Sequence, residues 1–419
     1  MRAALLTVGD ELLIGQIVDS NAAWIAAHLE EHGVRLVRKV TVGDEVAAVA
    51  QALKQLAADA EVVLITGGLG PTDDDRTLEA LALAAGVEQI FDEAVYARIR
   101  HIFEEIIRRP LSPSHRRQAM LPAGAEALRN SQGTAPGVWL ELADGGVVAA
   151  MPGVPREMKA LMREEIVPRL LARGGQRVRT QLTLLTAGHG ETQIADAIAE
   201  VERELVADGG GVAYLPSLGT VRLRLTAEGA EGAARVAAAA RAIRDALPPG
   251  SVFGEGELSL AAALLGALVE RGATVATAES CTAGQVARRL CAEPGASRAF
   301  VGGVVAYADE LKTGLLGVDP DLIRTHGAVS REVATAMAAG ARERLGADYA
   351  ASTTGIAGPG GARPGKPVGT VWIAVADADG VAARKLTLGR DRNTNIDYSA
   401  NAALNLLRLR VLGLAARDA

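Results

Sequence analysis

This sequence is poor in cysteine and in aromatic residues, and it has no long apolar run. Its two cysteines, Cys281 and Cys291, exclude a framework of several disulfides, and they lack the Cys-x-x-Cys spacing that holds zinc. No apolar stretch reaches the roughly 18 residues that cross a bilayer, and Asp10 comes too early for a signal peptide. We therefore expect a cytoplasmic protein with no membrane partner. Since aromatic residues make up only 3% of the chain, the cores must be built from Ala, Val and Leu.

Length and charge narrow the possibilities further. A chain of 419 residues is too long for one hydrophobic core and predicts two or three domains. Lys and Arg total 44 against 50 Asp and Glu, so the formal net charge is −6. Because nucleic-acid binding needs clustered positive charge, we expect no nucleic-acid partner.

The first 172 residues alternate strand-like and helix-like segments. Strands are predicted at 3–8, 34–40 and 62–66, and helices at 21–33 and 45–58, where the apolar residues have helical spacing. This order is typical of an α/β domain in which helices wrap a parallel sheet. The ligand of such a domain belongs at the carboxyl ends of the strands.

Two further domains are expected. Residues 173–255 have the order β-α-β-β-α-β of a small α+β module, with a hinge at 248–257. Residues 256–419 return to α/β alternation. Strands are expected there at 273–277, 300–307, 349–353 and 370–375, and a final helix at 393–412. The predicted fold class is therefore α/β, with two α/β domains joined by a small α+β module.

Ser280 follows the predicted strand 273–277 at a turn that leads into a helix. The first turn of a helix offers free N–H groups and the positive end of the helix dipole. Both features suit a nucleophile whose reaction creates an oxyanion. Ser280 and Thr282 would equally serve as caps of that helix, so this segment alone leaves both interpretations open.

Two later segments favour catalysis. Tyr307 and Lys312 come just after one strand, and a Gly-rich loop at 353–361 follows another. Such a loop presents N–H groups to a phosphate or an oxyanion. A serine with a lysine, a tyrosine and a threonine, and with no obvious His–Asp pair, is typical of Ser–Lys chemistry. Lys312 could equally be a solvated surface residue.

The first domain contains a second group of candidate residues. Residues 66–72 (Thr-Gly-Gly-Leu-Gly-Pro-Thr) follow a predicted strand and form a candidate phosphate-binding loop, and Asp73, Asp74 and Asp75 come next. Three acids beside a phosphate would repel it unless a cation intervened, so we expect a divalent metal ion there. An acidic first turn of a helix would explain the same three residues.

Three motifs of the last domain resemble the C-terminal domain of the competence/damage-inducible CinA family, the nicotinamide-nucleotide amidohydrolase. They are 278–282 (Ala-Glu-Ser-Cys-Thr), Tyr307 with Lys312, and 354–359 (Thr-Gly-Ile-Ala-Gly-Pro). The resemblance implies hydrolysis of nicotinamide mononucleotide to nicotinate mononucleotide and ammonia, without a cofactor. It also implies that Ser280 is either the nucleophile or the main polar contact to the amide. Thr354 would assist at the reacting centre, and Lys312 and Tyr307 would tune or orient the serine. The implied substrate contacts are Glu279, Thr282, Gly355, Gly358 and, for the phosphate, Arg390 or Arg392.

One residue departs from the pattern of the resemblance. Ala283 stands where many relatives have glycine, directly before Gly284. We expect this single methyl group to put little of what the resemblance implies in doubt.

The first domain resembles the molybdopterin-binding-like domain that opens proteins of the same family. The resemblance lies in residues 9–15, 66–75, 131–137 and 151–158. It implies metal-dependent hydrolysis of ADP-ribose to AMP and ribose 5-phosphate, in which the ion polarises a phosphoryl oxygen and activates water. The implied metal ligands are Asp74 and Asp75, and we add Asp10 and Glu157 as candidate ligands or bases. The expected substrate contacts are Gly67, Gly68, Gly70, Thr72, Gly133 and Thr134.

The middle module resembles the KH-type domain of the family. Nucleic-acid-binding KH domains clamp the backbone with a Gly-x-x-Gly loop, whereas residues 188–191 are Gly-His-Gly-Glu. We therefore expect a linker and dimerisation module with His189 as a turn residue, within a homodimeric, bifunctional hydrolase of pyridine-nucleotide recycling. Two alternatives stay open: a molybdopterin- or nucleotide-binding adaptor without N-terminal catalysis, and a competence-associated protein that acts on DNA.

Overall fold

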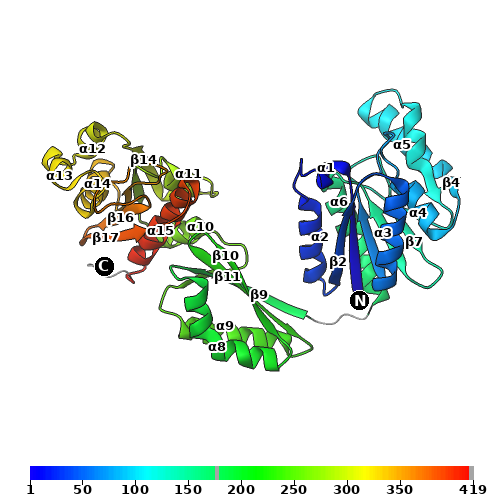
Figure 1. The fold of residues 1–419 in the computed structure, drawn as a ribbon, viewed down its shortest axis with the longest axis horizontal. Helices are drawn as coiled ribbons and strands as arrows, with labels where there is room; N and C mark the ends of the chain where they lie inside the picture. The colour runs from blue at the N-terminus through cyan, green and yellow to red at the C-terminus, as the bar shows by residue number, and fades with distance from the viewer. Residues whose placement is uncertain (175–178, 415–419) are drawn as a thin grey trace. The chain divides into compact units, whose positions relative to one another are not determined.

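The computed structural model describes residues 1–174 and 179–414, and the chain divides into two compact units, Met1–Arg179 and Thr180–Ala419 (Figure 1). Residues 175–178 and 415–419 lie outside the described residues; they fall within the ranges expected for the linker module and for the last domain. The linker module and the last domain thus belong to one compact unit. None of the helices in the described ranges has the length and apolar character that a membrane-spanning helix requires.

The first unit is built on a mixed sheet of six strands in the order β2-β1-β3-β8-β7-β6. β2, β1 and β3 run parallel, as predicted, and β8 pairs parallel with β3. β7 runs antiparallel to β8, and β6 runs antiparallel to β7. β7 and β8 are joined by a tight turn at 142–146, and so short a connection allows only antiparallel pairing. The strands are β1 (Arg2–Val8), β2 (Arg35–Val42), β3 (Val62–Thr66), β6 (Glu126–Leu128), β7 (Gly137–Glu141) and β8 (Val147–Met151).

Helices cover both faces of this sheet, because the central strands are apolar on both sides. One face packs against α3, α4 and α5, and the other against α2, α6 and α7. The helices are α1 (Asp10–Leu13), α2 (Ser20–Glu31), α3 (Val46–Asp59), α4 (Thr77–Ala85), α5 (Glu93–His101), α6 (Pro155–Leu161) and α7 (Val167–Arg173), with shorter helical segments η1 (Ile102–Ile107), η2 (Pro113–Ala119) and η3 (Met162–Ile166). A small antiparallel pair, β4 (Gln89–Phe91) with β5 (Met120–Pro122), was not predicted.

The linker module has the predicted order β-α-β-β-α-β. Its sheet has the order β10-β11-β9-β12, and α8 and α9 cover one face of it through a shared apolar core (Figure 1). The elements are β9 (Arg179–Ala187), α8 (Glu191–Ala207), β10 (Gly211–Ser217), β11 (Thr220–Glu228), α9 (Gly232–Ala246) and β12 (Val252–Glu255).

The last domain has a five-stranded sheet in the order β14-β13-β15-β16-β17. β14, β13 and β15 are parallel, and β16 and β17 are antiparallel to their neighbours. The strands are β13 (Val275–Glu279), β14 (Phe300–Val305), β15 (Tyr349–Gly355), β16 (Thr370–Asp377) and β17 (Gly380–Thr387). β17 was missed in the sequence, because Arg384 and Lys385 interrupt its apolar pattern at the edge of the sheet.

The helices of this domain also lie on both faces of its sheet. α10, α11 and α15 pack on one face, and α12 and α14 on the other. The helices are α10 (Leu260–Glu270), α11 (Gln285–Cys291), η4 (Ala296–Arg298), α12 (Asp309–Leu316), α13 (Pro320–His326), α14 (Arg331–Arg344) and α15 (Arg392–Val411). α15 also contacts the linker module, since Asn401 donates a hydrogen bond to the Leu218 carbonyl.

Candidate functional sites

Three parallel strands of the last domain end at one cavity of about 170 Å³. Ser280 follows β13, Tyr307 follows β14, and Thr354 and Gly355 end β15. The residues that line the cavity are Ser280, Cys281, Tyr307, Asp309, Lys312, Ala328, Val329, Thr354, Gly355, Ala357 and Arg392. The structure therefore brings together the four side chains expected to take part in catalysis.

Lys312 is a buried residue of this cavity and not a solvated surface lysine. Its side chain is 1% exposed, and its Nζ atom donates to the Tyr307 carbonyl at 2.9 Å and to Asp309 Oδ1 at 3.1 Å. An ammonium group has three N–H donors. One donor is therefore left for a group inside the cavity.

Ser280 is held at the cavity by its backbone. Its N–H donates to the Thr353 carbonyl at 2.9 Å, which ties the turn after β13 to the end of β15. Within the described part of the chain, Ser280 Oγ makes no hydrogen bond, so its lone pairs are available to a substrate. Neighbouring Cys281 is a poor competitor as nucleophile, because burial raises the pKa of its thiol to about 12 and keeps it protonated.

The free N–H groups expected at the start of the following helix are not free, so that prediction was wrong. The buried carboxylate of Glu279 accepts from Gly284 N at 3.0 Å, from Val286 N at 3.0 Å and from Ala287 N at 2.8 Å. Thr282 Oγ1 donates to the same carboxylate at 2.7 Å. Glu279 and Thr282 thus shape the turn that presents Ser280 and lie outside the cavity lining.

Ala283 adopts a left-handed backbone conformation in this turn, with φ of 50°. A side chain is strained in that region, whereas glycine is not. The methyl group of Ala283 therefore costs conformational energy in the turn that presents Ser280.

Of the two candidate arginines, only Arg392 lines the cavity. Its guanidinium group donates to the Gly358 carbonyl at 2.6 Å and to Tyr307 Oη at 3.4 Å, which places it between the Gly-rich loop and the tyrosine. Arg390 is exposed and outside the lining. Asn395 was missed in the sequence. It is fully buried, and its amide donates to the Ala357 and Arg390 carbonyls at 3.0 and 2.8 Å. Asn395 therefore ties the Gly-rich loop to the segment that leads into Arg392.

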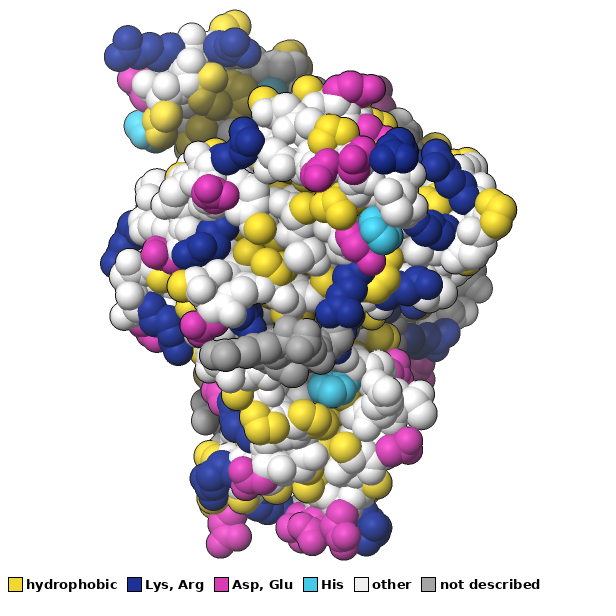
Figure 2. Space-filling model, turned by 90° about the vertical axis from the view of Figure 1, so that its left-hand side faces the viewer, with side chains coloured by type: hydrophobic (Ala, Val, Ile, Leu, Met, Phe, Trp, Pro, Cys, Tyr) yellow, Lys and Arg dark blue, Asp and Glu magenta, His cyan; other side chains and the backbone are white. Residues whose placement is uncertain are grey.

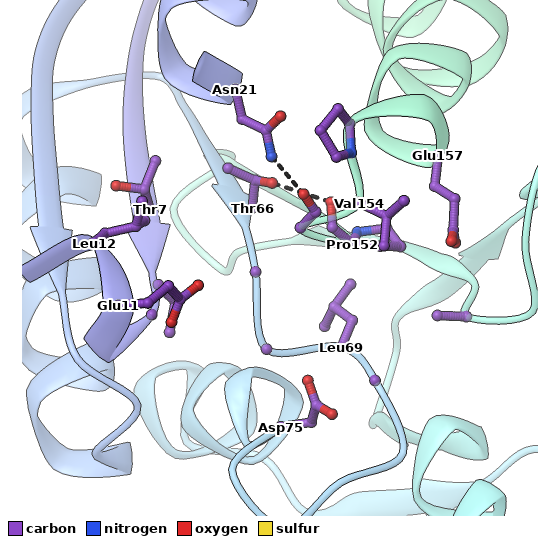
Figure 3. Close-up of a pocket in the computed structure, with 18 of the residues that line it drawn as sticks. Thr7, Glu11, Leu12, Asn21, Thr66, Leu69, Asp75, Pro152, Val154 and Glu157 are labelled. Carbon is purple, nitrogen blue, oxygen red and sulfur yellow. Dashed lines mark hydrogen bonds between the residues drawn. The ribbon is translucent and has the colours of Figure 1, made fainter. Parts of the chain in front are cut away.

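The second candidate site is a cavity of about 460 Å³ in the first unit, at the carboxyl ends of β1, β3 and β8. Figure 3 shows Glu11, Asp75 and Glu157 approaching it from three different segments, around the loop that carries Leu69. Asn21, at the start of α2, reaches the loop after β8, where it donates to the Gly153 carbonyl at 2.6 Å. This is the position at which an open α/β sheet binds its ligand.

The predicted glycine loop lines the same cavity, with Gly67, Gly68 and Gly70 on its wall. Gly67 has φ of 109°, and a Cβ atom there would lie 2.1 Å from the Val8 carbonyl oxygen. Only glycine fits this close approach between the ends of β3 and β1. Of the two predicted threonines, Thr134 lines the cavity and Thr72 does not. Gly133 is also outside the lining and packs against Glu157: a Cβ atom on Gly133 would lie 2.0 Å from Glu157 Oε2.

The acidic residues of the cavity only partly match those expected from sequence. Asp74, Asp75 and Glu157 line it, and so do Asp19, Glu11 and Asp44, which were not predicted. Asp10 does not line the cavity. Its carboxylate packs against Gly43, where a Cβ atom would lie 2.2 Å from Asp10 Oδ1. Asp73 is 95% exposed and forms an ion pair with Arg117. The acid that sequence reasoning missed is the next residue in the chain, since Glu11 lines the cavity and Asp10 does not.

The acids differ in how they are held. Asp75 Oδ2 accepts from Thr72 N at 2.9 Å and from Thr72 Oγ1 at 2.5 Å, so it also closes the loop. Glu157 Oε2 accepts from Asn130 at 2.6 Å. The pKa of Asp44 is raised by burial and by the nearby charges of Asp10, Glu11 and Asp74. A divalent cation or a proton would relieve this concentration of negative charge.

Three segments of the chain match known families. Residues 4–172 match a probable molybdopterin binding domain, residues 181–254 the KH domain of damage-inducible protein CinA, and residues 257–411 the CinA C-terminal domain.

Similar proteins span almost the whole chain. A CinA-like protein of Frankia casuarinae is 45% identical, over 99% of this chain and 97% of the relative. One of Salinibacter ruber is 43% identical, over 97% and 99%. Among solved structures, the crystal structure of the protein CinA with unknown function from Thermoplasma acidophilum is 34% identical; it covers 39% of this chain and 94% of that one, with a TM-score of 0.37.

Proposed function

This chain belongs to the CinA family, and from that premise we propose that its last domain hydrolyses the carboxamide of nicotinamide mononucleotide. The proposal rests on one observation above all: Ser280 and the buried Lys312 line the same small cavity. Tyr307, Thr354 and Arg392 complete that lining. The group is chemically suited to a serine nucleophile that uses a lysine for proton transfer.

In the proposed reaction, Lys312, which is an ammonium group beside Asp309 in the resting protein, first releases one proton to solvent. Ser280 Oγ then attacks the carboxamide carbon while its proton passes to the neutral amine of Lys312. Lys312 then delivers that proton to the departing nitrogen, so the C–N bond breaks and ammonia leaves. Water attacks the resulting ester, and its proton returns to Ser280 Oγ by the same route. Thr354 would assist at the reacting carbon, Tyr307 would orient the serine, and Arg392 would receive the phosphate.

The test is release of ammonia and nicotinate mononucleotide from nicotinamide mononucleotide. Ser280→Ala is expected to lose activity by at least about 10³-fold, as removal of a nucleophile usually does. Ser297→Ala, an exposed serine of η4 in the same domain, is the matched control and should keep full activity. Retention of activity by Ser280→Ala would exclude the serine from the reaction.

We propose a second, metal-dependent activity for the first unit, the hydrolysis of ADP-ribose to AMP and ribose 5-phosphate. The cavity supports this, since it combines a glycine loop with six carboxylates, the hard oxygen donors that Mg²⁺ prefers. In the described residues, these carboxylates do not form a set of three whose oxygens lie within 4.8 Å of one another. Glu11, Asp74 or Asp75 would therefore hold an ion together with water and the diphosphate, which is how Mg²⁺ is commonly bound.

Because no three of these carboxylates lie close together in the described residues, one alternative is also favoured: a nucleotide- or molybdopterin-binding unit without catalysis. The two proposals separate in one assay, with ADP-ribose and excess Mg²⁺ as substrate and AMP as product. Binding of ADP-ribose without AMP release would support the adaptor.

We further propose that the protein is a cytoplasmic homodimer that does not bind nucleic acid. Two free cysteines fit a reducing compartment, and symmetric dimers are the commonest oligomers. On the face shown in Figure 2, basic and acidic side chains are interspersed and no continuous basic stripe is seen. Light scattering and a DNA titration at physiological salt would test both statements.

A further inference from the structure

A row of side chains on α2 lies apart from the cavity of the first unit. Trp24, His28 and His32 follow one another at intervals of four residues, and their rings are in contact. The Trp24–His28 and the His28–His32 ring centroids are both 4.6 Å apart. Asn21, on the same helix, belongs to the cavity. His28 lies seven positions further along the helix, a rise of about 10 Å.

The hydrogen bonds of the two histidines favour the same tautomer. His28 Nδ1 lies 3.1 Å from Glu31 Oε2, and His32 Nδ1 lies 2.8 Å from the His28 carbonyl oxygen. With Nδ1 as the donor in both contacts, each ring keeps its Nε2 lone pair for a ligand. For His32 this is the arrangement of metal-binding histidines, which donate their other ring N–H to a carbonyl or a carboxylate. Glu31, whose side chain is 64% exposed, would leave His28 Nδ1 in order to bind an ion at Nε2.

One of these lone pairs has no partner in the described part of the chain. His28 Nε2 is buried and accepts no hydrogen bond there. A buried polar atom without a partner is unfavourable. A bound cation would satisfy it.

The electrostatic surroundings suit a cation at the His32 end of the row. That end is the last turn of α2, where the helix dipole is negative, and it carries the exposed carboxylate of Glu31. The positive side chains nearby, Lys159 and Arg163, lie over the Trp24 ring at 5.6 and 5.2 Å. The charge of Arg163 also reaches His28, where it adds a minor contribution to the lowering of the imidazole pKa that burial causes.

From this geometry we propose that His28, His32 and Glu31 form a binding site for a divalent transition-metal ion, of which Zn²⁺ is the representative. A donor atom from each of the three side chains can be chosen so that all lie within 4.8 Å of one another. Two imidazoles with one carboxylate select zinc, nickel, copper or cobalt over magnesium. Bound at the end of α2, the ion stabilises the helix whose first turn lines the cavity, and it takes no part in the proposed reactions.

Co²⁺ and Zn²⁺ titrations of the intact chain test this site, with 10 mM Mg²⁺, on the order of physiological levels, present to occupy sites of oxygen ligands. The wild-type protein is expected to bind one Zn²⁺ per chain with micromolar affinity and to show tetrahedral Co²⁺ absorption bands. His32→Gln should weaken binding by at least tenfold. Glu31→Gln, which alters a side chain that is 64% exposed and leaves the fold intact, should weaken it several-fold.

The matched control is His326→Gln, because His326 also lies beside a carboxylate, 3.8 Å from Glu332, without a second imidazole. It should leave Zn²⁺ affinity unchanged. The proposal is overturned if the wild-type protein binds no Zn²⁺ in the presence of Mg²⁺, or if His32→Gln and Glu31→Gln bind it as the wild type does.

Discussion

The Nζ atom of Lys312 lies 3.1 Å from Oδ1 of Asp309, one helical turn before it on α12. The lysine is 1% exposed and the aspartate 52%. A buried ammonium group is unfavourable unless an acceptor compensates its charge. Asp309 therefore allows a charged group to be kept beside Ser280, in a cavity that both residues line.

Asp309→Asn is expected to lower the free energy of unfolding by about 1–2 kcal/mol, because it leaves the Lys312 charge with a carbonyl acceptor alone. Urea unfolding measures this change, and the double variant with Lys312→Met should recover most of the loss. Asp321→Asn breaks an exposed pair with Arg324 and should change nothing measurable. Equal losses in both aspartate variants would contradict the argument.

Ala283→Gly is expected to stabilise the protein by about 0.5–1 kcal/mol, since glycine relieves the left-handed strain at this position. The shift in the unfolding midpoint measures it. Ala292→Gly is the control: Ala292 has φ of −68° at the end of α11, so glycine should cost about 0.5–1 kcal/mol there. Destabilisation by both substitutions would show that Ala283 is unstrained.

Asp377→Asn should reveal a pH-dependent contribution to stability. Asp377 accepts two hydrogen bonds from Arg410, at 2.5 and 2.6 Å, and this arginine holds the pKa of the carboxyl below its usual value of 3.8. A depressed pKa contributes stability above pH 3.8, which is lost as the pH falls through the folded value. At pH 7 the variant should be about 2–3 kcal/mol less stable.

The stabilities of wild type and Asp377→Asn should therefore converge as the pH is lowered toward 3, in thermal unfolding followed across the acid range. If the difference in stability between wild type and Asp377→Asn stayed constant down to pH 3, the charge of Asp377 would contribute nothing to the stability of the folded protein.

The two thiols should differ sharply in reactivity. With a pKa of about 12, Cys281 is a thiolate in only about one molecule in 10⁴ at pH 8, and it is buried, whereas Cys291 is exposed. A maleimide should therefore label one site per native chain and two in urea, as counted by mass spectrometry. Cys291→Ser should abolish native labelling; rapid native labelling of that variant would contradict the burial of Cys281.

The two neighbouring acids Asp10 and Glu11 should have unequal roles in the proposed ADP-ribose hydrolysis. Glu11 lines the cavity and Asp10 does not, so Glu11→Gln is expected to lower the activity at limiting Mg²⁺ by tenfold or more. Asp10→Asn should have a clearly smaller effect. The Mg²⁺ dependence of the rate measures both, and a larger effect of Asp10→Asn would reverse the assignment.

Much of the fold could be predicted from local patterns. The runs 3–8 and 62–66 are apolar throughout, as strands buried on both faces are, and they became β1 and β3. Ser259 precedes an apolar run, a typical position for a helix cap, and its hydroxyl accepts from Ala262 N at 2.9 Å at the start of α10. β17 and the β4–β5 pair were missed, since short or polar edge strands lack a distinctive period.

The sequence by itself determined the order of strands, helices and glycine turns, and it placed Ser280, Tyr307, Lys312 and Thr354 at or just after the ends of strands. Apolar period and turn chemistry are local, so they can be read along the chain. Only the tertiary structure decided that Lys312 is buried, that Glu279 occupies the helix N–H groups, and that Glu11 replaces Asp10 at the cavity. Burial and hydrogen bonding depend on segments that are far apart in the sequence. Two neighbouring residues, such as Asp10 and Glu11, can therefore have different surroundings that no local pattern reveals.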